Sequence, residues 1–535
     1  MKSVQRHIFL FVILAITVNL GLSASAAGYK YNMSYLSGGG TGYYTEIVND
    51  AQNSLNEVSP DYFSLDSGGN LVVSPDAGGS LVEEMHKKGI LVTPCLANGW
   101  DQAKGVAALN NADKLSSDLA AAVSAYNLDG VNIDIENVTP AERGKYVEFV
   151  RLLRSKLGSG KTVGVAVAAN PYGSATGWAG SYDYAGLAKY CDYLMIMTYD
   201  ESYYGGTPGP VASIGFIEKS LKYALSVVSK DKIVLGIPFY GRIWSAAGGA
   251  PSGYGISTVK VEVLIRDYSG TVAFDNTSKA ACATISVKAG DVKPIVAGKE
   301  LAAGTYKIWY SNEQSIKAAL ALVTKYDIKG TGSWSLGQES SQTWDYYRLW
   351  LNGCTFSDIQ TSWARDSILI SYMNQWMNGM SADIFAPDAP MTRAQAAAIL
   401  VRMLGLAPEV NSAYGFDDCK GSWAEKYIDT ARKYGVVSGI GGNLFAPEKA
   451  VTREEVTVML NNILKYADGD AAPVFSDVSL EKNSWSYTSI SALSEKGIIT
   501  GYPDGSFKPG NSITRGEAAA IFSRLDVSLL RNMLA

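Results

Sequence analysis

The chain has 535 residues, a hydrophobic fraction of 47%, a charged fraction of 18% and a formal net charge of -5. This length favours two or more domains, and the composition excludes a disordered or fibrous chain. The small negative charge provides no basic surface for phosphates, so nucleic acid is a poor candidate partner.

The first 27 residues are typical of an export signal. Lys2 and Arg6 form a basic start, residues 8–22 are uncharged and mostly apolar, and Ala24-Ser25-Ala26 is a small-residue cleavage site. The apolar run is short for a bilayer span, and no later segment is apolar for long enough to cross a membrane. Export followed by cleavage is therefore the prediction, and an uncleaved anchor is the alternative.

Short apolar runs alternate with amphipathic helical patterns from residue 28 to residue 353. Helical spacing of apolar residues covers 141–157, 214–229 and 313–326. The apolar runs predict the strands Tyr31–Tyr35, Tyr62–Leu65, Ile90–Leu96, Gly130–Ile135, Val163–Ala168, Tyr193–Met197, Ile233–Pro238 and Gly332–Ser335. Strands alternating with helices predict an α/β fold, a (β/α)8 TIM barrel. Strand-like pieces between residues 246 and 306 predict a small α+β insertion between the seventh and eighth strands.

The predicted fourth strand, LDGVNIDIEN, alternates apolar residues with Asn132, Asp134 and Glu136. This period of two indicates a strand with two different faces. Acids that face a barrel interior cost several kcal/mol of desolvation unless they have partners or a purpose. Alternate strand residues are separated by roughly 6.5 to 7 Å and approach a ligand from the same side, so these acids cannot face each other across a sugar.

The histidines and cysteines provide no pattern for a catalytic triad, a zinc site or a disulfide framework. His86 is the one histidine outside the predicted signal, and no motif of a Ser-His-Asp triad or of a His-ligated zinc site accompanies it. The five cysteines are scattered without paired spacing, so no complete disulfide framework is expected. If the chain is an enzyme, carboxylates must perform its proton chemistry.

The segment DGVNIDIE, residues 129–136, resembles the DxxDxDxE signature of glycoside hydrolase family 18. MTYD at 197–200, GIPFYGR at 236–242 and GSWSLG at 332–337 are similar to the family's motifs on the sixth, seventh and eighth strands. The resemblance extends from about residue 28 to residue 352. It implies substrate-assisted hydrolysis with retention, in which the substrate's own 2-acetamido group attacks and forms an oxazolinium.

The same resemblance implies roles for single residues. Glu136 would be the general acid and then the base, Asp134 would orient the acetamido N–H, and Tyr199 would hold the acetamido oxygen. The other residues expected around the substrate are Asp129, Asn132, Met197, Asp200, Tyr240, Arg242 and Trp334, the last as the floor of the −1 subsite. Most family chitinases carry an acid in place of Asn132, so Asp134 should ionise more easily here. No metal ion or cofactor is implied.

From Phe356 onward the chain repeats itself three times with a period of about 60 residues. An F-x-D motif opens each unit, and Thr392, Thr452 and Thr514 each precede an arginine and can cap a helix. The units resemble S-layer homology (SLH) domains. They predict a mainly helical region with repeats at 354–411, 412–470 and 471–535.

This second resemblance implies attachment to a pyruvylated secondary cell-wall polysaccharide, held in grooves between the repeats. A guanidinium fork matches a carboxylate, so the ketal-linked carboxylate would be bound by Arg393, Arg453 and Arg515. The grooves would be shaped partly by Asp358, Asp418 and Asp477. The first repeat has Gln395 where the family usually has Glu, so its groove departs most from the pattern. The alternative is that each Thr-Arg pair is only a helix cap and a surface charge.

The substrate remains open between two glycans. The third strand reads TPCLANGW and lacks the S-x-G-G of many family chitinases, whereas DE plus GPVAS after the sixth strand resembles the spore-cortex and cell-wall glucosaminidase branch. Peptidoglycan at the cell wall of a bacterium is therefore favoured, and chitin or chitooligosaccharide is the alternative. A non-catalytic glycan-binding surface protein is the competing class. Family lectins typically lose the acid that Glu136 provides here.

Overall fold

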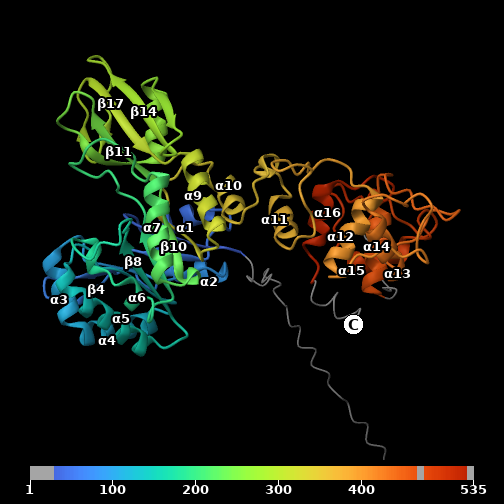
Figure 1. Ribbon diagram of the computed structural model, residues 1–535, viewed down its shortest axis with the longest axis horizontal. Helices are drawn as coiled ribbons and strands as arrows, with labels where there is room; N and C mark the ends of the chain where they lie inside the picture. The colour runs from blue at the N-terminus through green and yellow to red at the C-terminus, as the bar shows by residue number, and fades with distance from the viewer. Residues whose placement is uncertain (1–28, 467–474, 527–535) are drawn as a thin grey trace, which may run out of the picture.

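The computed structural model describes residues 29–466 and 475–526, and the predicted export signal lies outside them. Figure 1 shows three parts: a curled sheet surrounded by helices, a small sheet module beside it, and a helical region at the other end of the molecule. In the described ranges, no helix has both the length and the apolar character of a membrane span.

The curled sheet is the predicted barrel. Its parallel strands are β1 (Tyr31–Leu36), β2 (Glu57–Pro60), β3 (Phe63–Leu65), β5 (Leu91–Val92), β6 (Cys95–Ala97), β7 (Gly130–Asp134), β8 (Thr162–Ala168), β9 (Tyr193–Met197), β10 (Ile233–Pro238) and β18 (Gly330–Trp334). The short strand β4 (Leu71–Val73) is antiparallel to β3 at one end of the sheet. From β6 the strand order runs β7, β8, β9, β10, β18, β1, β2 and β5. The predicted α/β barrel architecture is confirmed.

The barrel is not closed by a continuous strand ladder. The third strand is broken at Thr93-Pro94, so that β5 pairs with β2 while β6 pairs with β7. Proline has no N–H to donate, which explains why the ladder is interrupted at this position. Single backbone bonds bridge the break, from Thr93 N to Val58 O at 3.0 Å and from Asn132 N to Pro94 O at 2.9 Å.

The second strand begins earlier than the sequence predicted. We expected it at Tyr62–Leu65, but β2 at Glu57–Pro60 is the segment that pairs with β1. Glu57 and Ser59 are fully buried. Two polar residues on the interior face remove the apolar pattern that identifies a strand from sequence.

Helices surround the sheet. They are α1 (Thr41–Asp50), α2 (Ser80–Lys87), α3 (Gln102–Asn110), α4 (Ala112–Ala125), α5 (Arg143–Leu157), α6 (Tyr184–Leu187), α7 (Ile214–Val227), α9 (Glu313–Lys325) and α10 (Thr343–Leu351). In α5, Tyr146, Phe149, Val150 and Leu153 recur with helical spacing and are fully buried. Each such side chain contributes about 1.5–3 kcal/mol by leaving water, which holds the helix on the sheet.

The insertion is a separate five-stranded antiparallel sheet. Its strands, in spatial order, are β12 (Ser252–Ser257), β11 (Tyr240–Ser245), β17 (Gly304–Tyr310), β14 (Ala280–Val287) and β13 (Thr271–Asp275). The helix α8 (Thr258–Asp267) and the hairpin of β15 (Ile295–Val296) and β16 (Lys299–Glu300) complete the module. The sheet starts at Tyr240, before the expected start at residue 246, so β11 follows β10 directly and lies beside the barrel.

The C-terminal region is helical. Its helices are α11 (Arg365–Met373), α12 (Arg393–Met403), α13 (Glu425–Lys433), α14 (Arg453–Leu464), α15 (Tyr487–Glu495) and α16 (Arg515–Phe522). Three backbone bonds form a closed triangle at its centre: Met391 N to Ile513 O, Val451 N to Met391 O, and Ile513 N to Val451 O, at 2.9–3.0 Å. The three repeats therefore surround a pseudo-threefold axis.

The helical region packs against the barrel at α10. Leu349 and Cys354 are buried in the core of the helical region. Arg365 of the first repeat donates to Gln52 Oε1 of the barrel at 2.7 Å. The two parts are therefore in direct contact through both apolar and polar groups.

Candidate active site

The two acids of the motif lie where β7 ends, at the carboxyl end of the barrel. Asn98, which is 2% exposed, binds both backbone groups of Glu136: its Nδ2 donates to Glu136 O at 2.8 Å and its Oδ1 accepts from Glu136 N at 2.9 Å. The N–H of Ile135 donates to the hydroxyl of Tyr146 at 3.3 Å. These contacts replace the strand ladder beyond Asp134 and hold the Glu136 side chain at a defined place.

Both acids have a raised pKa. Burial raises the pKa of Asp134 to about 6, and its Oδ2 accepts from the thiol of Cys95 at 3.9 Å. Burial, followed by the charges of Asp134 and Asp200, raises the pKa of Glu136 to about 9. Because like charges repel, the two carboxyls titrate as a pair in which Asp134 ionises first. At neutral pH the site therefore combines a protonated Glu136 with a largely ionised Asp134.

Tyr199 and Trp334 lie at the ends of two strands, β9 and β18, that are separated in the sheet by β10. Tyr199 follows β9. Burial, and then the charges of Asp134 and Glu136, raise the pKa of its hydroxyl well above the ordinary value. Gly236 on β10 makes room for this ring, because a Cβ there would lie 3.0 Å from Tyr199 Cε1. Trp334 ends β18, and Met197 packs in the same interior cluster.

Asp200, Tyr240 and Arg242 form one hydrogen-bonded group. Asp200 Oδ1 accepts from Tyr240 Oη at 2.8 Å and from Arg242 Nε at 2.9 Å. Arg242 Nη1 also donates to the carbonyl of Gly253 on β12 at 2.9 Å. The insertion therefore contributes two of the predicted site residues and fixes the carboxylate of a third.

Asp129 is not at this end of the barrel. It precedes β7, and its Oδ2 accepts from the Val92 N–H and contacts His86 Nε2, both at 2.8 Å. The expectation that Asp129 contacts substrate is therefore wrong, because the carboxylate joins α2 and β5 at the amino end of β7. The same contact gives His86, for which the sequence predicts no catalytic role, a structural partner.

Asn132 lies one step deeper than Asp134 and is fully buried. Its Nδ2 donates to Tyr193 Oη at 2.9 Å and its Oδ1 accepts from Tyr35 Oη at 3.0 Å. The Asn132 amide is therefore hydrogen-bonded to two tyrosines of the barrel interior and does not reach the mouth of the barrel.

Three residues near the acids were not predicted. Cys95 and Asn98 contact Asp134 and Glu136 as described, and both come from TPCLANGW, where an amide in an apolar strand run was a usable signal. Trp100 is 53% exposed, and its carbonyl accepts from the Asn137 side chain at 2.9 Å. The backbone of Trp100 is thereby joined to the residue that follows Glu136, and its exposed indole offers a flat apolar face to a ligand.

The three motif arginines of the helical region are 4–5% exposed and join neighbouring repeats. Arg393 Nε donates to Phe445 O at 2.8 Å, and the equivalent bonds run from Arg453 to Phe507 O at 2.7 Å and from Arg515 to Phe385 O at 2.9 Å. Each guanidinium therefore connects one repeat to the next around the ring.

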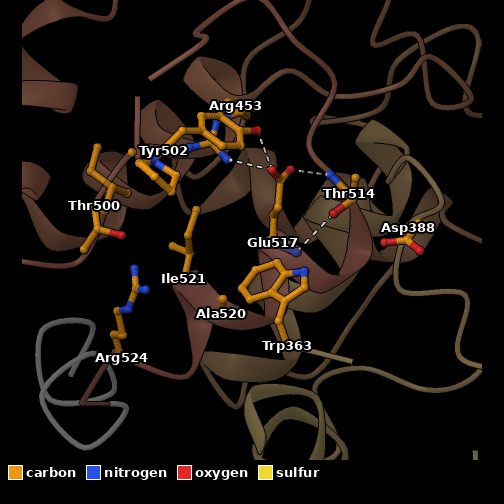
Figure 2. Close-up of a pocket in the computed structure, with 13 residues that line it drawn as sticks. Trp363, Asp388, Arg453, Thr500, Tyr502, Thr514, Glu517, Ala520, Ile521 and Arg524 are labelled. Atoms are coloured by element: carbon orange, nitrogen blue, oxygen red, sulfur yellow. Dashed lines mark hydrogen bonds and ion pairs between the residues drawn. The ribbon is translucent and has the colours of Figure 1, made fainter. Parts of the chain in front are cut away.

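One groove forms a pocket of about 460 Å³ between repeats. Figure 2 shows Arg453 and Tyr502 on one side of Glu517 and Trp363 on the other. Glu517 Oε1 lies 3.4 Å from Arg453 Nη1 and also accepts from Tyr502 Oη. Residues from all three repeats line this pocket, and Trp363 is 69% exposed.

The F-x-D aspartates accept hydrogen bonds from backbone N–H groups within their own repeats. Asp358 accepts from the backbone N–H groups of Phe385 and Ala386 at 2.9 and 2.7 Å. Asp418 and Asp477 bind the equivalent pairs of amides in the second and third repeats. Each carboxylate thus fixes the loop whose phenylalanine carbonyl receives a motif arginine.

The grooves differ in charge. Arg393 Nη1 pairs with Glu455 at 2.9 Å and Arg453 pairs with Glu517, but Gln395 stands at the equivalent position for Arg515. Within the described residues, no carboxylate lies within ion-pair distance of Arg515, whose Nη2 donates to Asn378 O at 2.6 Å. Burial lowers the pKa of Arg515 from its ordinary value. The groove between the third and first repeats thus has an arginine without an acid partner.

Comparison with known proteins agrees with both parts of this description. Residues 86–339 match the family described as Glycosyl hydrolases family 18, and residues 355–397, 415–457 and 474–519 match the S-layer homology domain. The two resemblances seen in the sequence are confirmed.

Individual relatives cover different shares of the chain. An uncharacterized glycosylase of Bacillus subtilis (strain 168), YvbX, is 27% identical over 359 residues, which are 64% of this chain and 98% of that protein. The cortical fragment-lytic enzyme of Bacillus anthracis is 25% identical over 235 residues, 43% of this chain and 52% of that enzyme, so this chain spans about half of its length. Among solved structures, a chitinase from Chromobacterium violaceum ATCC 12472 has a TM-score of 0.53 and 25% identity over 60% of this chain and 99% of that chain. The chain therefore carries a glycoside hydrolase family 18 domain, followed by three S-layer homology domains.

Proposed function

We propose that this chain is an exported, wall-anchored glycosidase that hydrolyses β-1,4 linkages of N-acetylglucosamine-containing glycans, with peptidoglycan as the favoured substrate. One arrangement carries the proposal: burial and the charge of Asp134 raise the pKa of Glu136 to about 9, which favours its protonated form, and the buried Oδ1 of Asp134 accepts no hydrogen bond from the described residues. The first group can give a proton, and the second can accept the N–H of an acetamido group.

The reaction proceeds in two steps. Glu136 donates its proton to the glycosidic oxygen while the carbonyl oxygen of the substrate's acetamido group attacks the anomeric carbon, so that the glycosidic bond breaks and an oxazolinium forms. Asp134 accepts the acetamido N–H and stabilises the positive charge. The Glu136 carboxylate then removes a proton from water, which opens the oxazolinium and regenerates the acid. Two displacements at one carbon retain the anomeric configuration.

The walls of the site suit a sugar ring. Trp334 at the end of β18 offers a floor, and Tyr199 supplies a hydroxyl that can hold the acetamido oxygen. Trp100, whose backbone is joined to Asn137, adds an exposed indole that can contact a sugar ring. Met197, Asp200, Tyr240 and Arg242 complete the proposed substrate-binding set. The relationship to the cortical fragment-lytic enzyme supports peptidoglycan, and the relationship to a chitinase keeps chitin as the alternative.

Product analysis separates the candidate functions. The full chain is incubated with purified peptidoglycan and with chitin, and mass spectrometry identifies the sugar at each new reducing end. N-acetylglucosamine at the new ends of muropeptides is the expected result. Release from chitin alone would select the chitinase alternative, and binding to either glycan without release would select the non-catalytic surface protein.

For the SLH domains we propose a pyruvylated secondary cell-wall polysaccharide as the partner. The repeats place Arg393, Arg453 and Arg515 at the boundaries between neighbouring units, where a guanidinium can receive a ketal-linked carboxylate. The aspartates Asp358, Asp418 and Asp477 would keep the shape of these boundaries. We further propose that the groove of Arg515 binds the anion most strongly, since among the described residues this arginine forms no ion pair that the anion would have to displace.

The substitution Gln395→Glu tests this ranking of the grooves. An acid at residue 395 is expected to pair with Arg515, as Glu455 pairs with Arg393, and to weaken binding of the pyruvylated polysaccharide about tenfold. The helix cap is retained because Gln395 Oε1 already accepts from the Thr392 N–H at 3.1 Å. Isothermal titration of the full chain measures the affinity, with depyruvylated polysaccharide as the control. An unchanged affinity for the pyruvylated form would contradict the ranking.

The substitution Asn132→Asp tests the amide on β7. A carboxylate there would bring another negative charge close to Asp134 and raise its pKa above the value of about 6, so the acidic limb of the pH–rate profile is expected to move to higher pH. Activity is expected to persist, because Glu136 and Asp134 are retained. The measurement is kcat/KM against pH for both proteins. Coincident profiles would mean that the amide serves packing alone.

A further inference from the structure

Glu57 is a buried carboxylate that the proposed mechanism does not use. It is the first residue of β2 and is 0% exposed inside the barrel. Its Oε1 accepts from Thr93 Oγ1 and Tyr193 Oη, and its Oε2 accepts from Tyr31 Oη, each at 2.5 Å. Burial raises the pKa of Glu57, while these hydroxyls and the charge of Lys329 act against that shift. A buried acid with three donors is well satisfied, but packing alone does not require a carboxylate there.

The hydrogen bonds that start at Glu57 have a single direction. Tyr193 has one hydroxyl proton, which it donates to Glu57, so its oxygen can only accept from the Asn132 amide. The Nδ2 of Asn132 must therefore face Tyr193, which turns Oδ1 toward Tyr35. Tyr35 donates its own hydroxyl proton to that oxygen at 3.0 Å. The chain of donors runs from Tyr35 through Asn132 and Tyr193 to Glu57.

The backbone leaves space for this chain. A Cβ on Gly164 of β8 would lie 2.5 Å from Tyr193 Oη and 2.8 Å from Asn132 Nδ2. Real Cβ atoms do not approach other atoms this closely, so a side chain at this position would separate the two groups. The junction between Tyr193 and Asn132 thus depends on a glycine of a third strand.

The direction of these hydrogen bonds determines whether Tyr35 can donate to Asp134 at the mouth of the barrel. Asp134 acts electrostatically on Tyr35, but the Tyr35 proton is already donated to Asn132. Asp134 Oδ1 therefore receives no hydrogen bond from the described residues, although it is buried. The titratable groups that interact electrostatically with Asp134 are Tyr35, Cys95, Glu136, Tyr146, Tyr182 and Tyr199.

We propose that Glu57 is a positioning residue of the active site: its carboxylate sets the direction of the Tyr193–Asn132–Tyr35 hydrogen-bond chain and so keeps Asp134 Oδ1 available for the acetamido N–H of the substrate. This inference rests on the proposed function. Glu57 touches neither substrate nor reacting atoms, and it acts through three strands other than its own.

The substitution Glu57→Gln tests the proposal. Glutamine has one acceptor oxygen and a donor amide, so it cannot accept from all three hydroxyls. The donors and acceptors of the Tyr193–Asn132–Tyr35 hydrogen-bond chain can then reverse, so that Tyr35 donates to Asp134. A hydrogen bond to Asp134 favours its ionised form, so the acidic limb is expected to move down by about one pH unit and kcat to fall about tenfold. An unchanged acidic limb and kcat would overturn the proposal.

Two single variants separate positioning from packing. Tyr193→Phe breaks the hydrogen-bond chain and is expected to shift the acidic limb. Thr93→Val removes a Glu57 donor outside that chain and is expected to lower Tm alone. In the Tyr193→Phe background, Glu57→Gln should cause no further shift of the limb. A full further shift, or an equal shift in Thr93→Val, would overturn the proposal. This pair of single variants decides the question even where Glu57→Gln does not fold.

A measurement that does not depend on turnover distinguishes failure of the proposed function from failure of the role of Glu57. The ionisation of Asp134 is followed by infrared difference titration of each full-length variant against its Asp134→Asn counterpart. The expected result is a lower pKa of Asp134 in Glu57→Gln and in Tyr193→Phe than in the unaltered chain. An unaltered chain that is inactive on both glycans sinks the proposed function, whereas an active chain whose Asp134 titrates identically in all variants sinks the role of Glu57.

Discussion

Replacing Glu136 with glutamine is expected to lower kcat by about 10³-fold or more on any glycan that the chain cleaves. Glutamine has nearly the same shape but no proton to give the leaving oxygen, and afterwards it cannot activate water. The backbone geometry should persist, because Asn98 binds main-chain groups of residue 136. KM is therefore expected to change little, and a loss in kcat with unchanged KM identifies an interaction made in the transition state.

A substrate with an activated leaving group sharpens this test. A 4-nitrophenyl glycoside needs less protonation than a sugar leaving group, so its first step should lose less from Glu136→Gln than the natural linkage does. The matched control is Asp134→Asn, which retains the acid and should impair both substrates alike. Retention of more than a tenth of the kcat on the natural linkage in Glu136→Gln would contradict the assignment of Glu136 as the acid.

The same variant is expected to be more stable than the unaltered chain at neutral pH. The pKa of Glu136 is about 9 in the folded chain, above the ordinary value of 4.5, so folding binds a proton that the unfolded chain releases. Stability from this group is fully present below pH 4.5 and is lost as the pH rises toward 9. Glutamine removes this dependence, and a gain of about 1–3 kcal/mol is expected at pH 7. Thermal unfolding at pH 4 and pH 7 measures the gain, which should disappear at the lower pH.

Alanine at Trp363, Trp423 and Trp485 together is expected to weaken retention on isolated wall sacculi by about 10²-fold or more, since each repeat would lose an aromatic face and multivalent binding multiplies such losses. These side chains are 69%, 54% and 57% exposed, so the fold should be unaffected. Co-sedimentation with sacculi measures retention. Turnover of a short soluble oligosaccharide should stay unchanged, because the barrel is not altered.

Removal of residues 354–535 is the coarser form of this experiment. It also uncovers Leu349, which is 1% exposed in the full chain and packs in the core of the helical region. The point variants are therefore the cleaner test of wall binding. Undiminished binding to sacculi after the truncation would show that the barrel domain itself holds the wall, and the anchoring role of the repeats would be wrong.

Much of the architecture could be predicted from local pattern. Apolar runs separated by amphipathic helices predicted the barrel, and a period of about 60 residues predicted the three helical units. The order of the short motifs placed Asp134 and Glu136 at the end of β7, Tyr199 after β9 and Trp334 at the end of β18, where the structure has them. These features depend on side-chain periodicity and on short spacings, which a single sequence displays directly.

Other features depended on contacts between distant segments. β2 was missed because Glu57 and Ser59 are buried polar residues, whose partners lie on strands far away in the chain. Asp129 was assigned to the substrate because it belongs to the motif, yet the direction of β7 places it at the opposite end of the barrel from Glu136. Spacing within a motif does not reveal which of its residues lie at the carboxyl end of the curled sheet.

The sequence by itself determined the two domain types, the acids that we propose as catalytic and the position of the motif arginines. Only the tertiary structure decided how these residues are partnered: that Asn132 is held between Tyr193 and Tyr35, and that Arg515 lacks the acid that Arg393 has. The physical reason is that hydrogen bonds and ion pairs form between side chains brought together by strand register and by ring closure of the repeats. Neither of these is encoded in the local periodicity of the chain.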